Sequence, residues 1–146
     1  MGPDSQHNGN SMLVGDNWIG RVVNAIENGP AWSSTAVFIT YDDCGCFYDH
    51  VAPPPGLGFR MPMVIVSPYV KAGYTDSKVA TFASMLAFIE RNFHLAPLGA
   101  SDASAYDYAH AFDFSQAPLS PIRMVVSPVP ASELAWITAH PDRSET

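Results

Sequence analysis

Two adjacent aspartates, two cysteines and a histidine follow directly on an apolar run of the sequence. The stretch FITYDDCGCFYDHVAPPP covers residues 38–55, with Asp42 and Asp43 at the end of the run and His50 a few residues later. Two carboxylates packed together repel each other, and a divalent cation between them removes that conflict. Carboxylate and imidazole ligands together suit zinc, with manganese or iron as alternatives. The stretch therefore predicts a metal site at the end of a strand.

A second interpretation of the same residues needs no metal. Asp42 and Asp43 can cap a turn, and His50 can donate a hydrogen bond to the backbone. The two cysteines, Cys44 and Cys46, would be strong zinc ligands as thiolates. Two cysteines alone do not make the usual closed structural zinc site, however, and the chain has no others. We therefore favour a metal for the aspartates and treat the cysteines as small buried fillers or as neighbours of the ligands.

Four regular elements are expected to position these residues. The expected ranges are a helix over 18–26, strands over 34–41 and 61–68, and a second helix over 79–93. Asp16 is the predicted N-cap of the first helix, and Asp76 or Ser77 that of the second. The order helix, strand, strand, helix predicts an α/β sandwich, in which ligands gather beyond the carboxyl ends of the strands.

The expected organisation is one domain with a leader and an extension. Residues 1–14 form a flexible or site-contributing leader, residues 15–118 the core and residues 119–146 a C-terminal extension. Within the extension, residues 121–130 predict a short edge strand, because their flanking prolines would interrupt a central one. Residues 132–140 predict one or two final helical turns.

Composition and charge limit the classes of function that the chain can have. Charged residues make up 14% and hydrophobic residues 47% of the 146 residues, so the chain can bury a core as one domain. The net charge of -7 argues against a nucleic-acid partner. No apolar run has the length of a membrane helix, so no stable membrane insertion is expected. The N-terminus lacks the basic and apolar regions of a signal peptide, so the chain as it stands would be cytoplasmic, but the sequence leaves the compartment open.

Three long segments carry a family signature. They are GDNWIGRVVNAIENGPAWSSTAVFITYDDCGCFYDHVAPP, MPMVIVSPYVKAGYTDSKVATFASMLAFIERNF and FDFSQAP, which begin at residues 15, 61 and 112. Over residues 4–118 the sequence resembles bacterial phosphoesterases of the non-specific phospholipase C and acid phosphatase type, members of the alkaline phosphatase superfamily. The resemblance implies a truncated alkaline-phosphatase-like αβα sandwich with a small, mainly parallel sheet.

The resemblance also implies roles for individual residues. Asp42 and Asp43 match the family's paired metal-binding aspartates, and both are expected to act in catalysis. His7 matches a histidine at the phosphate site and is expected to be both a catalytic residue and a metal ligand. His50 matches the histidine of the Tyr-Asp-His-Val motif, and Asp4 is a weaker candidate ligand. The implied cofactor is a divalent metal, with Zn²⁺ preferred and Mn²⁺ or Fe as alternatives.

The resemblance departs from the family in length. Family members carry an N-terminal half that supplies a serine or threonine nucleophile and a further metal ligand. Nothing before Asp4 is expected to supply these, and Ser5, Ser11 and Thr40 have no motif support as replacements. Water activated by the metal would then replace the nucleophile, since a divalent ion lowers the pKa of bound water to about 7. Apolar surface left uncovered predicts a homo-oligomer.

These expectations lead to one function with two alternatives. The leading hypothesis is a permissive metal-dependent phosphohydrolase that cleaves small phosphate mono-, di- or triesters. The first alternative is a catalytically inactive fragment that only binds metal. The second is one part of a split enzyme whose partner carries the nucleophile.

Overall fold

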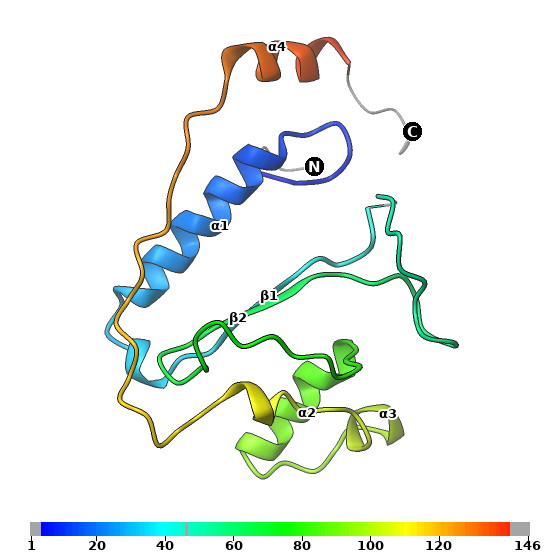
Figure 1. Cartoon of the computed structure of the whole chain (residues 1–146), viewed down its shortest axis with the longest axis vertical. Coiled ribbons are helices and arrows are strands. Elements are labelled where there is room, and N and C mark those ends of the chain that lie inside the picture. Colours follow the sequence, from blue (N-terminus) through cyan, green and yellow to red (C-terminus); the bar gives the residue numbers. More distant parts are fainter. Residues whose placement is uncertain (1–3, 46, 141–146) are drawn as a thin grey trace. The chain divides into compact units, whose positions relative to one another are not determined.

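The computed structural model describes residues 4–45 and 47–140, which fold into two compact units. The first unit contains the described residues of 1–34, 39–64 and 120–146, and the second contains residues 35–38 and 65–119. The elements, in chain order, are α1 (Met12–Glu27), η1 (Trp32–Ser34), β1 (Val37–Thr40), β2 (Met63–Val66), α2 (Phe82–Asn92), α3 (Ala100–Ala103), η2 (Ala109–Ala111) and α4 (Ala131–Ala139). Figure 1 labels the α-helices and the strands, while η1 and η2 are short 3-10 helices.

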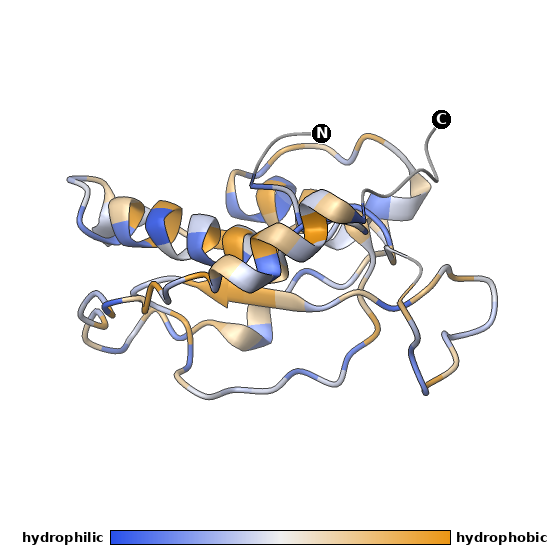
Figure 2. Ribbon diagram, turned by 90° about the horizontal axis from the view of Figure 1, so that it is seen from above, coloured by the Kyte–Doolittle hydropathy of each residue, from blue (hydrophilic) through white to orange (hydrophobic). Residues whose placement is uncertain are grey.

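Helix α1 begins earlier than the sequence pattern predicts. Its N-cap is Ser11, whose Oγ accepts a hydrogen bond from the Val14 N–H at 3.1 Å, so the expected cap at Asp16 is wrong. A hydroxyl at this position satisfies one of the first-turn amides that have no partner inside the helix. The helix ends at Glu27, and its C-cap Asn28 precedes the Gly-Pro stop. In Figure 2 its turns alternate between hydrophilic and hydrophobic colours, as in an amphipathic helix.

Helix α2 also uses a different cap from the expected one. Its N-cap is Thr81, whose N–H donates to Ser84 Oγ at 3.1 Å. The predicted caps at Asp76 and Ser77 are therefore wrong. Asp76 has other contacts, because its carboxylate accepts hydrogen bonds from the Lys78 N–H and from the Tyr106 hydroxyl.

The two strands pair antiparallel, in contrast to the mainly parallel sheet that the resemblance implies. Strands β1 and β2 form a two-stranded sheet, and in Figure 1 the chain runs out along β1 and returns along β2. A parallel pair would need a crossover connection, whereas the described residues of 41–62 form only turns and loops. Thr40 Oγ1 donates to the Pro62 carbonyl at 2.8 Å, where this connection starts and ends. The αβα layering stays a prediction.

An extended segment, residues 122–127, runs along α1 in the first unit, and we call it the strap (Figure 1). The Met124 N–H donates to Asn24 Oδ1 at 2.9 Å, and Asn24 Nδ2 donates back to the Met124 carbonyl at 3.3 Å. Asn17 makes the same exchange with Ser127, at distances of 2.8 and 2.7 Å. Each amide side chain therefore satisfies both backbone groups of one strap residue.

Glu27 continues this ladder at the end of the helix. Its carboxylate accepts a hydrogen bond from the Ile122 N–H at 3.2 Å. Asn17 and Asn24 are almost two whole turns apart, and Glu27 follows Asn24 by three residues, so all three lie on the same side of the helix. Asn17 and Glu27 are only 4% and 2% exposed, so the hydrogen bonds replace water that these groups have lost. The expected edge strand is wrong, because the strap bonds to side chains instead of a neighbouring strand.

Helix α4 confirms the helical turns predicted at the end of the chain. Its first turn carries Glu133, which accepts a hydrogen bond from the Ser11 hydroxyl. Ser11 is 6% exposed, and it also caps α1. The start of α1 and the start of α4 are therefore joined through one hydroxyl group.

Aromatic side chains form the interior of the second unit. The ring of Phe38 lies 5.0 Å from that of Phe88 and 5.5 Å from that of Tyr108, measured between centroids. Phe88 lies 5.1 Å from Phe112 in turn. Tilted and offset ring pairs of this kind contribute about 0.5–1.5 kcal/mol beyond their buried area. The end of β1 in this unit is thereby packed against α2.

A pair of buried carboxyl groups joins α2 to α3. Glu90 and Asp102 are 6% and 4% exposed, and the Leu98 N–H donates to both, at 3.2 and 2.6 Å. Burial and the hydrogen bond with Asp102 raise the pKa of Glu90. Burial opposes the charge of Asp102 as well, but hydrogen bonds from Glu90, Leu98 and Gly99 lower the pKa of Asp102 overall. Their shared environment therefore favours a protonated Glu90 beside an ionised Asp102.

No helix among the described residues combines the length and the apolar character needed to cross a membrane.

Replacing Asn17 with alanine is expected to lower the free energy of unfolding by about 1–3 kcal/mol, because both backbone groups of Ser127 lose their partner. Urea denaturation measures this loss, and hydrogen exchange at Ser127 should accelerate. Asn28→Ala is the control, because Asn28 is exposed and, within the described part of the chain, its side chain bonds only to the Asn24 backbone carbonyl of its own helix. Equal losses in the two variants would contradict a role for the ladder.

Replacing Glu90 with glutamine is expected to remove a pH dependence of stability. The folded protein binds the proton of Glu90 more tightly than the unfolded chain does, because the pKa of Glu90 is raised from its ordinary value of 4.5. The resulting stabilisation is complete below pH 4.5 and is lost as the pH rises through the raised pKa of the folded state. In the native chain both carboxyl groups become negative there and repel, whereas the amide of the variant donates to Asp102 at every pH. Urea denaturation from about pH 5 to pH 8 should show a decline in the native chain and a flatter curve in the variant. Parallel curves would contradict the raised pKa of Glu90.

Candidate functional site

Asp42 and Asp43 lie directly after β1 in a tight turn, residues 42–45, which we call the acidic turn. Asp43 Oδ1 accepts a hydrogen bond from the Gly45 N–H at 2.6 Å, and Asp42 Oδ1 accepts one from the Asp43 N–H at 3.2 Å. Aspartate side chains commonly stabilise turns in this way. The turn-capping interpretation is therefore confirmed for both residues. The charges of both carboxylates remain at the surface, because Asp42 and Asp43 are exposed.

Gly45 has a backbone conformation that requires glycine. Its φ angle is +53°, and an added Cβ would lie 3.0 Å from two ring carbons of Phe47. A larger residue would therefore strain the backbone and displace the ring. Cys44 is half-buried in the acidic turn, and the prediction for Cys46 falls outside the described residues.

The leader contributes a second loop, residues 5–10, which we call the leader loop. It is held by hydrogen bonds from the His7 N–H to Ser5 Oγ at 3.1 Å and from the Asn10 N–H to the His7 carbonyl at 3.0 Å. Asn8 Nδ2 donates to the Gly45 carbonyl at 3.1 Å, so this loop is bonded directly to the acidic turn. The structure thus brings the segment that carries His7 beside the two aspartates.

Asn8 was missed by the sequence analysis, although its side chain makes the connection. The available signal is local, because Asn8 precedes Gly9 in a stretch rich in turn-forming residues. Such a pattern predicts a turn and does not predict which segment the amide contacts.

The other two predicted ligands lie elsewhere. Asp4 faces Arg21 of α1 at 3.5 Å, and His50 is exposed in the loop after the acidic turn. Among the described residues, no three histidine, cysteine, aspartate or glutamate side chains are gathered as metal ligands. The structure brings Asp42 and Asp43 together, with the leader loop beside them, and it does not bring Asp4 or His50 into that group. The metal-ligand roles of all five residues stay predictions.

The chemistry of the acidic turn nevertheless fits a divalent cation. Asp42 and Asp43 are adjacent and exposed, and the ion pairs between described residues leave both without a basic partner. Neighbouring carboxylates of this kind are oxygen donors for hard or borderline cations, and an imidazole adds a nitrogen donor. The arrangement can supply two carboxylates directly, while any third ligand requires a change in side-chain position.

An ion pair closes the loop that follows the acidic turn. Arg60 donates to both carboxylate oxygens of Asp49, at 2.8 and 2.9 Å. Its hydrogen bonds, with one from the Val51 N–H, lower the pKa of Asp49 to about 2. Asp49 therefore stays ionised and bound to arginine at neutral pH, although it neighbours His50.

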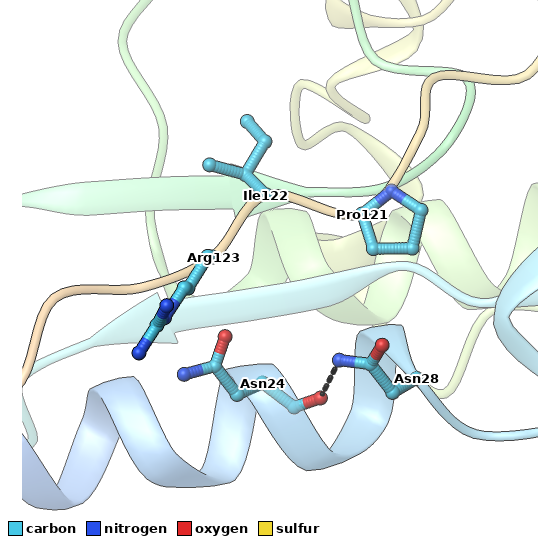
Figure 3. A pocket seen from close by; sticks show the side chains of 5 residues that line it. All are labelled: Asn24, Asn28, Pro121, Ile122 and Arg123. Carbon is cyan, nitrogen blue, oxygen red and sulfur yellow. Dashed lines mark hydrogen bonds between the residues drawn. The ribbon is translucent and has the colours of Figure 1, made fainter.

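A hollow of about 380 Å³ lies beside the strap, well away from any predicted site residue in the sequence. Figure 3 shows its lining residues, which are Asn24, Asn28, Pro121, Ile122 and Arg123. The side-chain oxygen and nitrogen of Asn24 both bond to the strap. Asn28 Nδ2 donates to the backbone carbonyl of Asn24 at 2.7 Å. The hollow is a consequence of how the strap meets α1, and we assign it no catalytic role.

Comparison with known proteins gives a family match that includes the candidate site. The model of the Phosphoesterase family matches residues 2–96, which include the leader loop, α1, both strands and α2. The chain is 34% identical to a non-hemolytic phospholipase C of Burkholderia pseudomallei over 108 residues, which are 53% of this chain and 15% of the relative. It is 28% identical to a hemolytic phospholipase C of Pseudomonas aeruginosa, covering 82% of this chain and 20% of the relative.

A plant protein shows a similar degree of likeness. The non-specific phospholipase C6 of Arabidopsis thaliana is 29% identical over 64% of this chain and 23% of its own length. The chain thus spans between 15% and 23% of the length of these three relatives. The extent of the family match, which includes both the acidic turn and the leader loop, shows that the chain belongs to the Phosphoesterase family.

Proposed function

We propose that the chain hydrolyses phosphate esters with the help of a divalent metal, at a site centred on the acidic turn. The observation that carries this proposal is the hydrogen bond between Asn8 and Gly45, which places the leader loop beside Asp42 and Asp43. These two segments both fall inside the region that matches the Phosphoesterase family. The relatives described above are named phospholipases C, which supports phosphoric esters as the substrate class.

Each residue of the proposed site would have its own role in catalysis. Asp42 and Asp43 would hold the cation, and His7, on the adjoining leader loop, would approach the phosphate. A divalent ion bound there would lower the pKa of water to about 7 and offset the negative charge of the phosphoryl group. The hydrogen bond between Asn8 and Gly45 would fix the distance between the leader loop and the carboxylates of the acidic turn.

The exposure of the acidic turn bears on selectivity. Asp42 and Asp43 are both exposed, so larger esters can approach their carboxylates. We propose phosphate mono- and diesters as substrates, with triesters as a further possibility of the same open site. Zinc is the preferred cation because carboxylate and imidazole donors suit it, followed by manganese and iron.

A second candidate function is metal binding without turnover. It is favoured by the observation that Asp42 and Asp43 already accept hydrogen bonds within their own turn. In that case the cation would only stabilise the fold, by mass action. A melting temperature that rises with added zinc, in a protein that hydrolyses no ester, would support this candidate over the first.

Replacing Asp43 with asparagine is expected to reduce ester hydrolysis at least about 100-fold, because the cation loses one of two charged ligands. Asparagine keeps the Oδ1 acceptor that bonds the Gly45 N–H, so the turn should persist. Release of a chromogenic phosphate ester measures the rate after chelation and again after addition of zinc or manganese. Activity is expected to disappear on chelation and to return with metal.

Asp16→Asn provides a matched control, because Asp16 is an exposed aspartate of α1 outside the acidic turn. It should leave hydrolysis and its metal dependence unchanged. Activity that survives complete metal removal, or full turnover by a folded Asp43→Asn variant, would contradict the proposed function.

A further inference from the structure

The loop that follows the acidic turn carries an unusual concentration of exposed apolar side chains. We call residues 47–60 the aromatic loop. The exposed fractions of its large apolar residues are 92% for Tyr48, 68% for Phe59, 58% for Phe47, 40% for Val51 and 39% for Leu57. Figure 1 shows this stretch running out from β1 and back towards β2. Aromatic side chains this exposed, clustered in one loop, mark a contact surface more often than isolated exposed residues do.

The aromatic loop is electrically neutral on an acidic chain. Its charged residues are Asp49 and Arg60, which form a bidentate ion pair. Arg60 Nε and Nη2 lie 2.8 and 2.9 Å from the two carboxylate oxygens of Asp49, so the two charges neutralise each other. The chain as a whole carries a net charge of -7. Three consecutive prolines, residues 53–55, further restrict the loop, which lowers the entropy lost when it binds. The loop therefore presents a restrained, uncharged aromatic surface.

These properties distinguish between possible lipid surfaces. Phenylalanine and tyrosine favour the boundary between headgroups and acyl chains, where one side of the ring is apolar and the hydroxyl of tyrosine stays hydrated. An anionic membrane would repel a chain of this net charge, and a basic patch that could overcome the repulsion is lacking among the charged residues of the loop. A zwitterionic surface imposes no such repulsion.

We propose that the aromatic loop inserts into zwitterionic lipid surfaces and brings the acidic turn to the level of the lipid phosphates. The loop begins two residues after Gly45, so Asp42 and Asp43 lie at its base. The inference rests on the proposed function in naming phospholipid headgroups as the esters that the site meets. The binding step itself depends on Phe47, Tyr48 and Phe59 and needs no catalysis.

Flotation with phosphatidylcholine vesicles tests the proposal. The double variant Phe47→Ser/Tyr48→Ser is expected to bind vesicles about tenfold more weakly, since it removes apolar area of two rings from the interface. Leu98→Ser is the matched control, because Leu98 is 84% exposed and lies outside the aromatic loop. It should bind as the native chain does. Arg60→Gln should also weaken binding, because it leaves the Asp49 carboxylate unpaired within the loop.

The outcomes separate this inference from the proposed function. Hydrolysis of a small soluble ester should be equal in the native chain and the double serine variant, while Asp43→Asn should lose hydrolysis and still bind vesicles. A native chain that does not float with phosphatidylcholine, or a double variant that floats equally well, would overturn the inference and leave the proposed function intact. Stronger binding to anionic than to zwitterionic vesicles would overturn it too. So would a double variant that loses only self-association, since the loop would then bind protein.

Discussion

The candidate site depends on one hydrogen bond between two segments that are far apart in the sequence. Asn8 donates to the Gly45 carbonyl, and the Gly45 N–H in turn donates to Asp43. Gly45 can occupy this point because glycine adopts a positive φ angle without strain. Without that connection, the leader loop and the acidic turn would be two independent surface features. With it, a histidine-bearing loop and two adjacent carboxylates form one surface of the first unit.

The same unit relies on polar side chains where a larger domain would use an apolar core. Asn17, Asn24 and Glu27 pair with the backbone of the strap, and two of the three are almost fully buried. Buried amides that satisfy both groups of a peptide avoid the cost of an unpaired polar group. The second unit is different, since rings that include Phe38, Phe88 and Phe112 form its interior.

The sequence predicted the regular elements and the position of Asp42 and Asp43 at the end of a strand, but few of the contacts that these residues and elements make. Hydrophobic spacing located both long helices and both strands, because periodicity records which face of an element is buried. It placed both N-caps wrongly, since Ser11 and Thr81 compete with acidic residues that look equally suitable in sequence. Sheet direction depends on how a connection folds, and the antiparallel return of residues 41–62 has no periodic signature. The contact of Asn8 was unpredictable for the same reason, because a long-range hydrogen bond leaves no local pattern.

The central claim is that the acidic turn and the leader loop form one cation site. The most direct test is to titrate the protein with Mn²⁺ and follow the paramagnetic broadening of backbone amide resonances. The account predicts that the signals of Asp43, Gly45 and Asn8 broaden together at low metal, before those of Glu27 and Asn28 at the far end of α1 in the same unit. Broadening that begins around Glu90 and Asp102 instead, or that leaves the acidic turn unaffected, would contradict it.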